Sequence, residues 1–451
     1  MSPWIASLPI RNTYETLGQN VKTDIAIIWG GVAGCATAYF LLKNTDKKIT
    51  LVEWSKIAHG ASWHNAGLCS TYFERDIQDY IMLYGYERTM NTQKGVLEAN
   101  VLLEEMIARL ANHGQYIPIT KTIETTTLIT KEDILRSLAT IKTMQESGIA
   151  VECLFVWDHV EFDEHTRITY GDYYKTISIN ELHSLAKNNN PDILAVEIRN
   201  TILANTALLC DELIHYLWHA YKDRFFVHEY TMIKDITLYE TYGIATTQDN
   251  ILLEAQQIIL CTNGFTHFTI HDTTQQWNHR FHEKMTGYIS HMLGYTSPHV
   301  LPEHAYCYTI NNTWNTTMFE EKPYYYMTLR PHNDQQLICI GGEETVLEDE
   351  HTYTSDYTIP AAKAKHMRKY IHQHNTLTHK ENLYEAYQWH GTIWYTPDGL
   401  RIVWPDTYNN VLRYNVWCNG IGVLPSIYGA QRISDKMNNI PVVDCLFDVE
   451  K

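Results

Sequence analysis

Residues 24–34 read DIAIIWGGVAG, and a second apolar run, ITLVE, ends at Glu53. The first run is typical of a buried strand, its glycines of a tight turn, and the apolar residues after Val32 of a helix. A strand, a glycine turn and a helix N-terminus together form the pyrophosphate site of dinucleotide-binding folds. Glu53 lies 19 residues beyond Gly34, the spacing at which a carboxylate reaches an adenosine ribose. The segment therefore predicts an α/β, Rossmann-like dinucleotide-binding domain.

Trp29 stands where this turn normally has its first glycine. Glycine there makes the tight turn and leaves room beside the pyrophosphate, so an indole is expected to clash. Gly31, Gly34 and the start of the helix remain, and we still expect the turn to contact a dinucleotide. The predicted contacts are Trp29, Gly30, Gly31, Val32, Ala33, Gly34 and Glu53.

Composition narrows the protein class. With 451 residues, of which 45% are hydrophobic, the chain is long enough for two packed domains. A net charge of −17 disfavours a nucleic-acid partner or an anionic membrane surface. No apolar run is long enough to span a membrane, and the first 20 residues do not have the pattern of a signal peptide. We therefore expect a cytoplasmic protein.

Neither the cysteines nor the histidines suggest a metal site. The nine cysteines are scattered and include no C-x-x-C pair, so neither a disulfide framework nor a zinc site is expected. His279, His282 and His291 show no metal-ligand spacing. We predict no metal.

No repeat or low-complexity linker divides the chain, so we expect interleaved domains. The region 285–350 is expected to be rich in strands, with the runs YYYMTLR and QLICIGG on either side of a polar turn at Asn333 and Asp334. Such a sheet could cover a substrate cavity. The other expected helices lie at 76–112, 131–147, 207–221 and 359–374, and the other expected strands at 225–231 and 257–264.

Five segments together resemble the FAD-dependent oxidoreductases of the D-amino-acid oxidase, glycine oxidase and sarcosine oxidase family. They are the turn with Glu53, the loop HGASWHNAG at 59–67, the strand end at 261–264, and the motifs TPDG (396–399) and CNGIG (418–422). The resemblance implies an α+β protein in which a Rossmann-like FAD-binding domain is interleaved with a substrate domain built on a large antiparallel sheet. The implied ranges are 1–90, 200–280 and 385–451 for the FAD-binding domain, and 91–199 and 281–384 for the substrate domain.

The resemblance also implies the chemistry, which is oxidation of a C–N bond of an amine or amino acid by hydride transfer to FAD. The protein then has to position the substrate, keep its amine neutral and exclude water. No acid–base pair is demanded, and we assign no catalytic residue. Beyond the turn and Glu53, the implied FAD contacts are Ser62, His64, Asn65, Ala66, Gly67, Ile233, Thr262, Asn263, Gly264, Asn419, Gly420, Ile421 and Gly422.

Three side chains are candidates for substrate binding: Arg330, Tyr324 and Tyr326. A guanidinium suits a carboxylate and aromatic walls suit an apolar amine; the alternative is an exposed strand arginine beside core tyrosines. His64 has three interpretations. The run around it is similar to the segment of dimethylglycine and sarcosine dehydrogenases that bonds flavin covalently, but His64 could also be a noncovalent flavin contact or a packing residue.

Trp29, Trp394, Trp404 and Trp417 all stand where relatives typically have glycine. Glycine makes up about 5% of this chain, against an average near 7%. We hypothesise that in-frame UGA codons, which some bacterial genetic codes read as glycine, have been translated here as tryptophan. Two other functions remain open, a flavin-free relative that acts as a binding protein and a flavoenzyme that acts on a modified tRNA base. The amine and the electron acceptor are not determined by the sequence.

Overall fold

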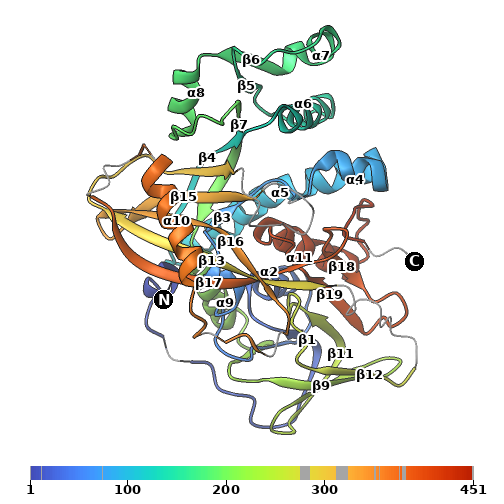
Figure 1. Ribbon diagram of the computed structural model, residues 1–451. Coiled ribbons are helices and arrows are strands. Elements are labelled where there is room, and N and C mark those ends of the chain that lie inside the picture. Colours follow the sequence, from blue (N-terminus) through green and yellow to red (C-terminus); the bar gives the residue numbers. More distant parts are fainter. Residues whose placement is uncertain are drawn as a thin grey trace.

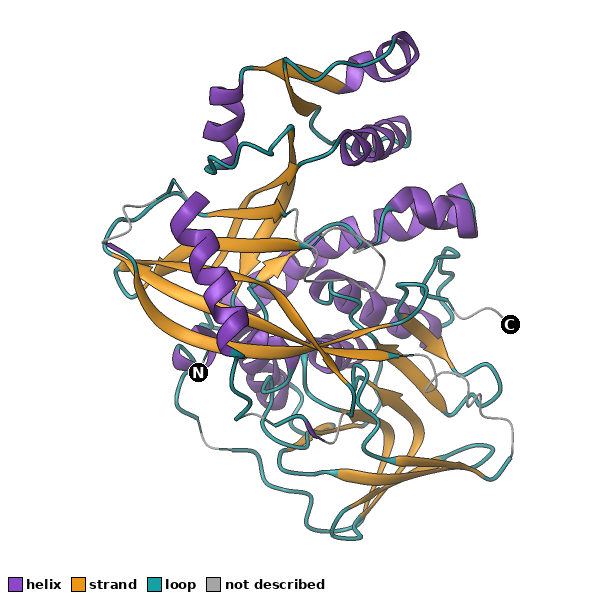
Figure 2. Cartoon of the chain, viewed as in Figure 1, coloured by secondary structure: helices purple, strands orange, loops and turns teal. Residues whose placement is uncertain are grey.

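The chain is described here from a computed structural model (Figure 1). It describes residues 2–11, 13–73, 75–274, 285–310, 323–349, 352–354, 356–374, 376–377 and 382–448. Within these ranges the strands form two large sheets, and Figure 2 shows helices lying between and beside them. The mixed α/β architecture predicted from the sequence is confirmed.

The first sheet contains the predicted dinucleotide fold. Its strand order is β12-β9-β10-β11-β1-β2-β8, with β19 beside β11 and β18 beside β19. The neighbours β11, β1, β2 and β8 run parallel, as a doubly wound fold requires. Its strands are β1 (Val21–Ile28), β2 (Ile49–Val52), β8 (Phe225–His228), β9 (Ile233–Leu238), β10 (Gly243–Thr247), β11 (Leu252–Leu260), β12 (Thr269–Asp272), β18 (Ile402–Pro405) and β19 (Leu412–Val416).

The second sheet has the order β17-β13-β16-β15-β14-β4-β7-β5-β6, with β3 beside β7. Most of its pairs are antiparallel; β14 with β4 and β5 with β6 are parallel. The predicted large antiparallel sheet is therefore present. Its strands are β3 (Leu68–Cys69), β4 (Ile119–Leu128), β5 (Leu154–Trp157), β6 (Tyr174–Ile177), β7 (Ala195–Ala204), β13 (Thr286–Ser297), β14 (His304–Thr309), β15 (Tyr324–His332), β16 (Gln335–Leu347) and β17 (Tyr384–Tyr395).

Helices separate the two sheets and cover their outer faces. A continuous hydrophobic core joins α2, α5, α9 and α11 to strands of both sheets, while α10 packs on the opposite face of the second sheet (Figure 1). The helices are α1 (Pro3–Ala6), α2 (Val32–Asn44), α3 (Ala61–His64), α4 (Ile77–Tyr84), α5 (Tyr86–Ala111), α6 (Lys131–Glu146), α7 (Glu164–Tyr170), the 3-10 turn η1 (Gly171–Tyr173), α8 (Ile179–Ala186), α9 (Thr206–Ala220), α10 (Ala361–His374) and α11 (Val423–Met437).

Two local expectations can be compared directly with the backbone. Asn333 and Asp334 have φ angles of 48° and 60°, as a two-residue hairpin turn requires, and they join β15 to β16 as predicted. The helix expected over 76–112 is instead two helices, because Gly85 adopts a φ of 85° between α4 and α5. The domain ranges remain a prediction; their boundary at residue 385 falls inside β17, which pairs with β13 in the second sheet.

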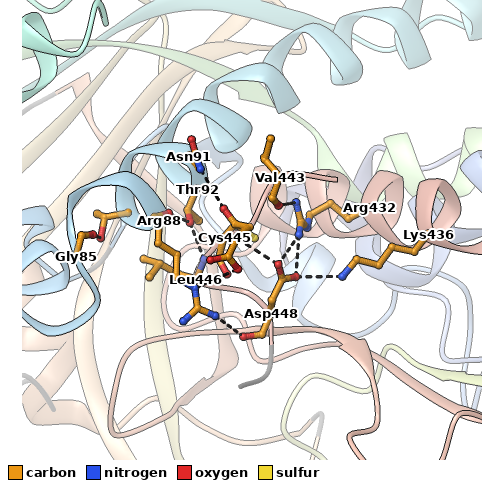
Figure 3. Close-up of polar contacts among 12 residues, drawn as sticks. Gly85, Arg88, Asn91, Thr92, Arg432, Lys436, Val443, Cys445, Leu446 and Asp448 are labelled. Carbon is orange, nitrogen blue, oxygen red and sulfur yellow. Dashed lines mark hydrogen bonds and ion pairs between the residues drawn. The ribbon is translucent and has the colours of Figure 1, made fainter. Parts of the chain in front are cut away.

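The C-terminal segment is fixed by a buried ion cluster (Figure 3). Asp448 accepts hydrogen bonds from Arg432 Nη2 at 2.7 and 2.8 Å and from Lys436 Nζ at 3.2 Å, both on α11. Arg88 of α5 donates to the carbonyl oxygens of Cys445 and Asp448 at 3.1 and 2.9 Å. The cluster therefore fastens the chain end to α5 and α11.

Candidate cofactor and substrate site

The glycine turn lies at the carboxyl end of β1, where ligands bind in parallel α/β sheets. Trp29 N donates to Val52 O at 2.8 Å, which holds the turn against β2. A Cβ at position 34 would overlap the Trp29 carbonyl oxygen, so only glycine fits there. Helix α2 begins at Val32. The N–H groups and the positive dipole end of its N-terminus lie at the turn, an arrangement that favours phosphate binding.

Glu53 lies beside this turn, as the spacing predicted. Its carboxylate accepts hydrogen bonds from Gly30 N at 2.8 Å and from Ser55 N at 3.0 Å. The side chain is buried, and this desolvation raises its pKa to about 7 in spite of the two N–H donors. The geometry places a carboxylate at the turn, whereas contact with a ribose remains a prediction.

The predicted flavin loop at 59–67 is anchored to the same turn. Ser62 Oγ accepts from Val32 N at 2.9 Å, which connects the loop to the start of α2. Asn65 Oδ1 accepts from Gly67 N at 2.7 Å, and Asn65 Nδ2 donates to Thr206 Oγ1 at 2.7 Å. Gly67 has a φ of 69°. Polar side chains of the loop thus fix its backbone. Ala66, which is part of the loop, is buried.

The C-terminal motifs meet the strand end at 261–264. Cys418 N donates to Asn263 Oδ1 at 2.9 Å, and Asn419 Oδ1 accepts from Thr396 N at 2.8 Å. Asn263, Asn419 and Gly420 all have positive φ angles, so these are tight turns. The predicted contacts Thr262, Gly264, Ile421 and Gly422 lie in the same turns. Ile233 is the first residue of β9 and is buried in the core of the first sheet.

Indole rings fill the space between these turns. Trp29 has a φ of 82°; its ring stacks on Trp54 at 5.5 Å and lies 5.4 Å from Phe265. Phe265 in turn contacts Trp394, with ring centroids 5.3 Å apart. Trp417 has a φ of 66°. The backbone, Glu53 and the helix N-terminus thus suit FAD, whereas the Trp29 side chain is the group that does not suit it.

His64 is held at the edge of β17. Its Nδ1 contacts the His390 carbonyl oxygen and lies 3.5 Å from Tyr353 Oη, and its own carbonyl accepts from Trp389 Nε1 at 3.1 Å. Burial lowers the pKa of His64 well below its usual value, so the ring is neutral. Sequence reasoning missed Tyr353 and His390, although His390 belongs to the WHG motif beside TPDG.

Arg330 has peptide carbonyls as partners. Its Nη2 donates to Ala66 O and Gly67 O, each at 3.1 Å, and its Nη1 donates to Ala204 O at 3.2 Å. The guanidinium also lies 4.5 Å from the centroid of the Trp4 ring. Arg330 is buried, which corrects the expectation of an exposed strand arginine. These contacts hold the flavin loop, and they account for the residue without a substrate carboxylate.

A cavity of about 890 Å³ is lined by residues of the second sheet and of the helices beside it. It begins at Thr71–Phe73, a few residues beyond Gly67, and extends between helices α4, α5 and α6 and strands β4, β7, β14 and β15. Tyr324 lines it. Tyr326, two residues along the same strand face, has its hydroxyl 3.1 Å from Ser290 Oγ.

Strand pairing connects this cavity to the flavin loop along one face of the second sheet. Tyr326 lies opposite Gly341 on one side and Cys307 on the other, and Cys307 lies beside Thr126. In the other direction Gly341 pairs with Met292, which pairs with Trp389. Trp389 contacts His64, and Cys307 and Thr126 line the cavity. One row of residues thus runs from the flavin loop to the cavity.

Comparison with known proteins agrees with this geometry. The family described as FAD dependent oxidoreductase (DAO) matches residues 24–435. The chain belongs to this family. FAD is the family's cofactor, and the turn, Glu53 and the flavin loop are the residues that would hold it.

Similar solved structures cover almost the whole chain at low identity. A glycine oxidase from Geobacillus kaustophilus is 15% identical with a TM-score of 0.67, over 95% of this chain and 99% of that one. An L-α-glycerophosphate oxidase from Mycoplasma pneumoniae, solved with FAD bound, is 14% identical with a TM-score of 0.65, over 93% and 95%. At this identity they establish the shared fold.

A curated relative matches over a shorter stretch. It is the γ-glutamylputrescine oxidoreductase of Escherichia coli, 26% identical over 105 residues, which are 23% of this chain and 24% of the relative. The match thus spans about a quarter of the relative. Within the described ranges, no helix is long and apolar enough to cross a membrane, and no group of three His, Cys, Asp or Glu side chains is placed to hold a metal. His279 and His282 lie outside those ranges.

Proposed function

We propose that the protein oxidises a C–N bond of a small amine or amino acid by hydride transfer to FAD. The main support is the cavity, whose lining starts a few residues beyond the flavin loop in the chain and includes Tyr324, on the sheet face that also carries Tyr326. The amine and amino-acid chemistry named for several similar proteins points in the same direction. We further propose a cytoplasmic location and no nucleic-acid partner, in keeping with the net charge of −17.

The chain's own residues have positioning roles in this proposal. The first turn of α2 would hold the pyrophosphate of FAD and Glu53 its adenosine ribose, while Arg330 fixes the backbone of the flavin loop. Tyr324 and Tyr326 form an aromatic wall for the substrate, and a substrate that displaces water from the partly open cavity would favour its own neutral amine. When bound, FAD supplies the acceptor for the hydride from the carbon next to nitrogen.

The test uses a quadruple glycine variant, with glycine introduced at Trp29, Trp394, Trp404 and Trp417. After reconstitution with FAD, the flavin absorbance near 450 nm is followed without oxygen while amines, amino acids, hydroxy acids and glycerol phosphate are added. Bleaching by an amine or amino acid supports the proposal. Bleaching by the hydroxy compounds alone would overturn it, as would a folded variant that takes up no FAD.

A further inference from the structure

The segment that follows the flavin loop runs along strand β7 as far as the cavity. Ala204 N donates to Gly67 O at 2.9 Å, and β3 continues antiparallel to β7. Thr71 Oγ1 then donates to Asn200 O at 3.3 Å. Strand β7 is continuous from Arg199 to Ala204, and five residues of a strand span about 17 Å. Arg199 therefore lies on the cavity wall at a distance from the flavin loop.

Arg199 lines the cavity, and two neighbours fix its guanidinium group. Its Nε donates to Glu197 Oε1. Its planar group lies over the Tyr72 ring, 4.6 Å from the centroid, as a cation–π contact. The terminal nitrogens Nη1 and Nη2 have no hydrogen-bond partner within the described ranges. Neither is fully buried, and the side chain is 25% exposed. The terminal donors of a fixed guanidinium are thus available to a ligand.

Strand pairing places Arg199 on the sheet face that the cavity covers. Side chains two apart on a strand share a face, so Arg199 lies on the face of Glu197. Glu197 lies opposite Thr126, and Thr126 lies beside Cys307. All four residues line the cavity. The guanidinium therefore belongs to the rows of side chains that form one wall of this cavity.

The charges around Arg199 keep it protonated. Burial alone would lower the pKa of Arg199, but the carboxylate of Glu197 raises it above its usual value. Glu197 also accepts from Ser137 Oγ at 2.9 Å. Glu124, opposite Arg199, accepts from Tyr72 Oη at 2.6 Å, and burial raises the pKa of this glutamate. Each carboxylate thus has a hydroxyl donor of its own, and the Nη1 and Nη2 groups of the guanidinium are left for a ligand.

We propose that Arg199 binds a carboxylate of the substrate that is remote from the oxidised C–N bond. The proposal rests on the proposed function for that bond alone. The two terminal N–H donors of a guanidinium match the two oxygens of a carboxylate. The distance along β7, about 17 Å, separates this carboxylate from the flavin loop, so the substrate is an extended amine with an acidic end. The lining also contains apolar side chains, among them Leu97 and Phe155, which suit the carbon chain between the two groups.

The first test is calorimetric titration of the purified protein with hexanoate, hexanamide and hexylamine, which share a carbon chain and differ in charge. We expect hexanoate to bind more tightly than the other two. Arg199→Gln should weaken hexanoate binding at least tenfold. Glu197→Gln should strengthen it at least twofold, because it removes the negative charge beside the guanidinium. Arg167→Gln, at an exposed position of α7, is the control and should change the dissociation constant less than twofold.

The second test examines the distance between the two groups. In the FAD-loaded quadruple glycine variant, 10-aminodecanoate should bleach the flavin at a lower half-saturating concentration than decylamine does. Adding Arg199→Gln should remove this difference. Bleaching by 4-aminobutanoate, which is too short to reach Arg199 from the flavin loop, should not depend on Arg199.

Tighter binding of hexylamine than of hexanoate would overturn the proposal, as would unchanged hexanoate binding by folded Arg199→Gln. If Arg199→Gln does not fold, the double variant with Glu197→Gln removes both charges of the ion pair and is compared with Glu197→Gln alone, with the same expected loss.

The two proposals can fail separately. Hexanoate binding that depends on Arg199, together with no flavin bleaching by any amine, would refute the proposed oxidation and leave the carboxylate site standing. Equal bleaching by 10-aminodecanoate and decylamine, unaffected by Arg199→Gln, would keep the oxidation and overturn the remote carboxylate.

Discussion

Replacing Trp29 with glycine should convert a poor FAD site into a good one. A φ of 82° costs a non-glycine residue about 1–3 kcal/mol. The contacts of the indole with Trp54 and Phe265 contribute about 0.5–1.5 kcal/mol each. Relief of the backbone cost therefore offsets only part of the loss of these ring contacts and of the burial of the partly buried indole.

FAD binding should become tighter. To admit the pyrophosphate, the indole has to leave both aromatic contacts, which costs about 1–3 kcal/mol, or roughly 5- to 150-fold in the dissociation constant. Glycine removes this cost. We therefore expect Trp29→Gly to bind FAD roughly 5- to 150-fold more tightly than the parent, measured by quenching of flavin fluorescence during titration of the cofactor-free protein.

Trp404→Gly is the matched control. It removes an indole from β18, where the ring contacts Lys436 of α11 rather than the phosphate turn. A loop or side chain can move aside there, whereas the N–H groups of the turn must all converge on one anion. The reasoning would be refuted if the parent bound one FAD per chain, or if Trp404→Gly raised the affinity as much as Trp29→Gly.

Four further measurements test other parts of the structure. In the Trp29→Gly background, Glu53→Ala should weaken FAD binding by about 1.5–3 kcal/mol per lost charge-assisted bond; unchanged affinity would remove Glu53 from the site. Because burial raises the pKa of Glu53 from 4.5 to about 7, the folded state binds more protons than the unfolded state in that interval. Stability should therefore fall as pH rises from 4.5 to 7, by up to about 3 kcal/mol, and a Glu53→Gln variant with the same slope in urea unfolding would exclude this carboxyl as the cause. Asp448→Ala leaves Arg432 buried without its carboxylate and should lower the free energy of unfolding by about 3–5 kcal/mol, whereas Asp444→Ala, with a side chain 70% exposed, should cost under about 1 kcal/mol; equal effects would contradict the role of the cluster. Acid precipitation of the FAD-loaded variant should release the flavin into the supernatant, because His64 Nδ1 is already held by the His390 carbonyl; yellow precipitate would instead indicate a covalent bond.

Features determined by neighbouring residues could be predicted from the sequence. The order of apolar run, glycines and helix at 24–34 placed the turn at the end of β1, and the spacing to Glu53 placed that carboxylate beside Gly30. The hairpin at Asn333 and Asp334 follows in the same way from residues that tolerate positive φ. In each case the chemistry of the segment itself selects the backbone.

Features determined by distant pairing could not be predicted. Arg330 was either a candidate for substrate binding or an exposed strand arginine, and its partners come from residues 66, 67 and 204, which the sequence does not place beside it.

The backbone also bears on the hypothesis that glycine codons were translated as tryptophan. At Trp29 and Trp417 the φ angles of 82° and 66° are ones that glycine adopts freely and a tryptophan rarely does. Trp404 has no positive φ angle, and its ring lies beside Lys436. Trp394 lies within β17 and needs no special backbone, but its ring lies against Gly264 and Gly287. Glycine would therefore relieve a backbone problem at Trp29 and Trp417, and a gene with UGG codons at all four positions would refute the hypothesis.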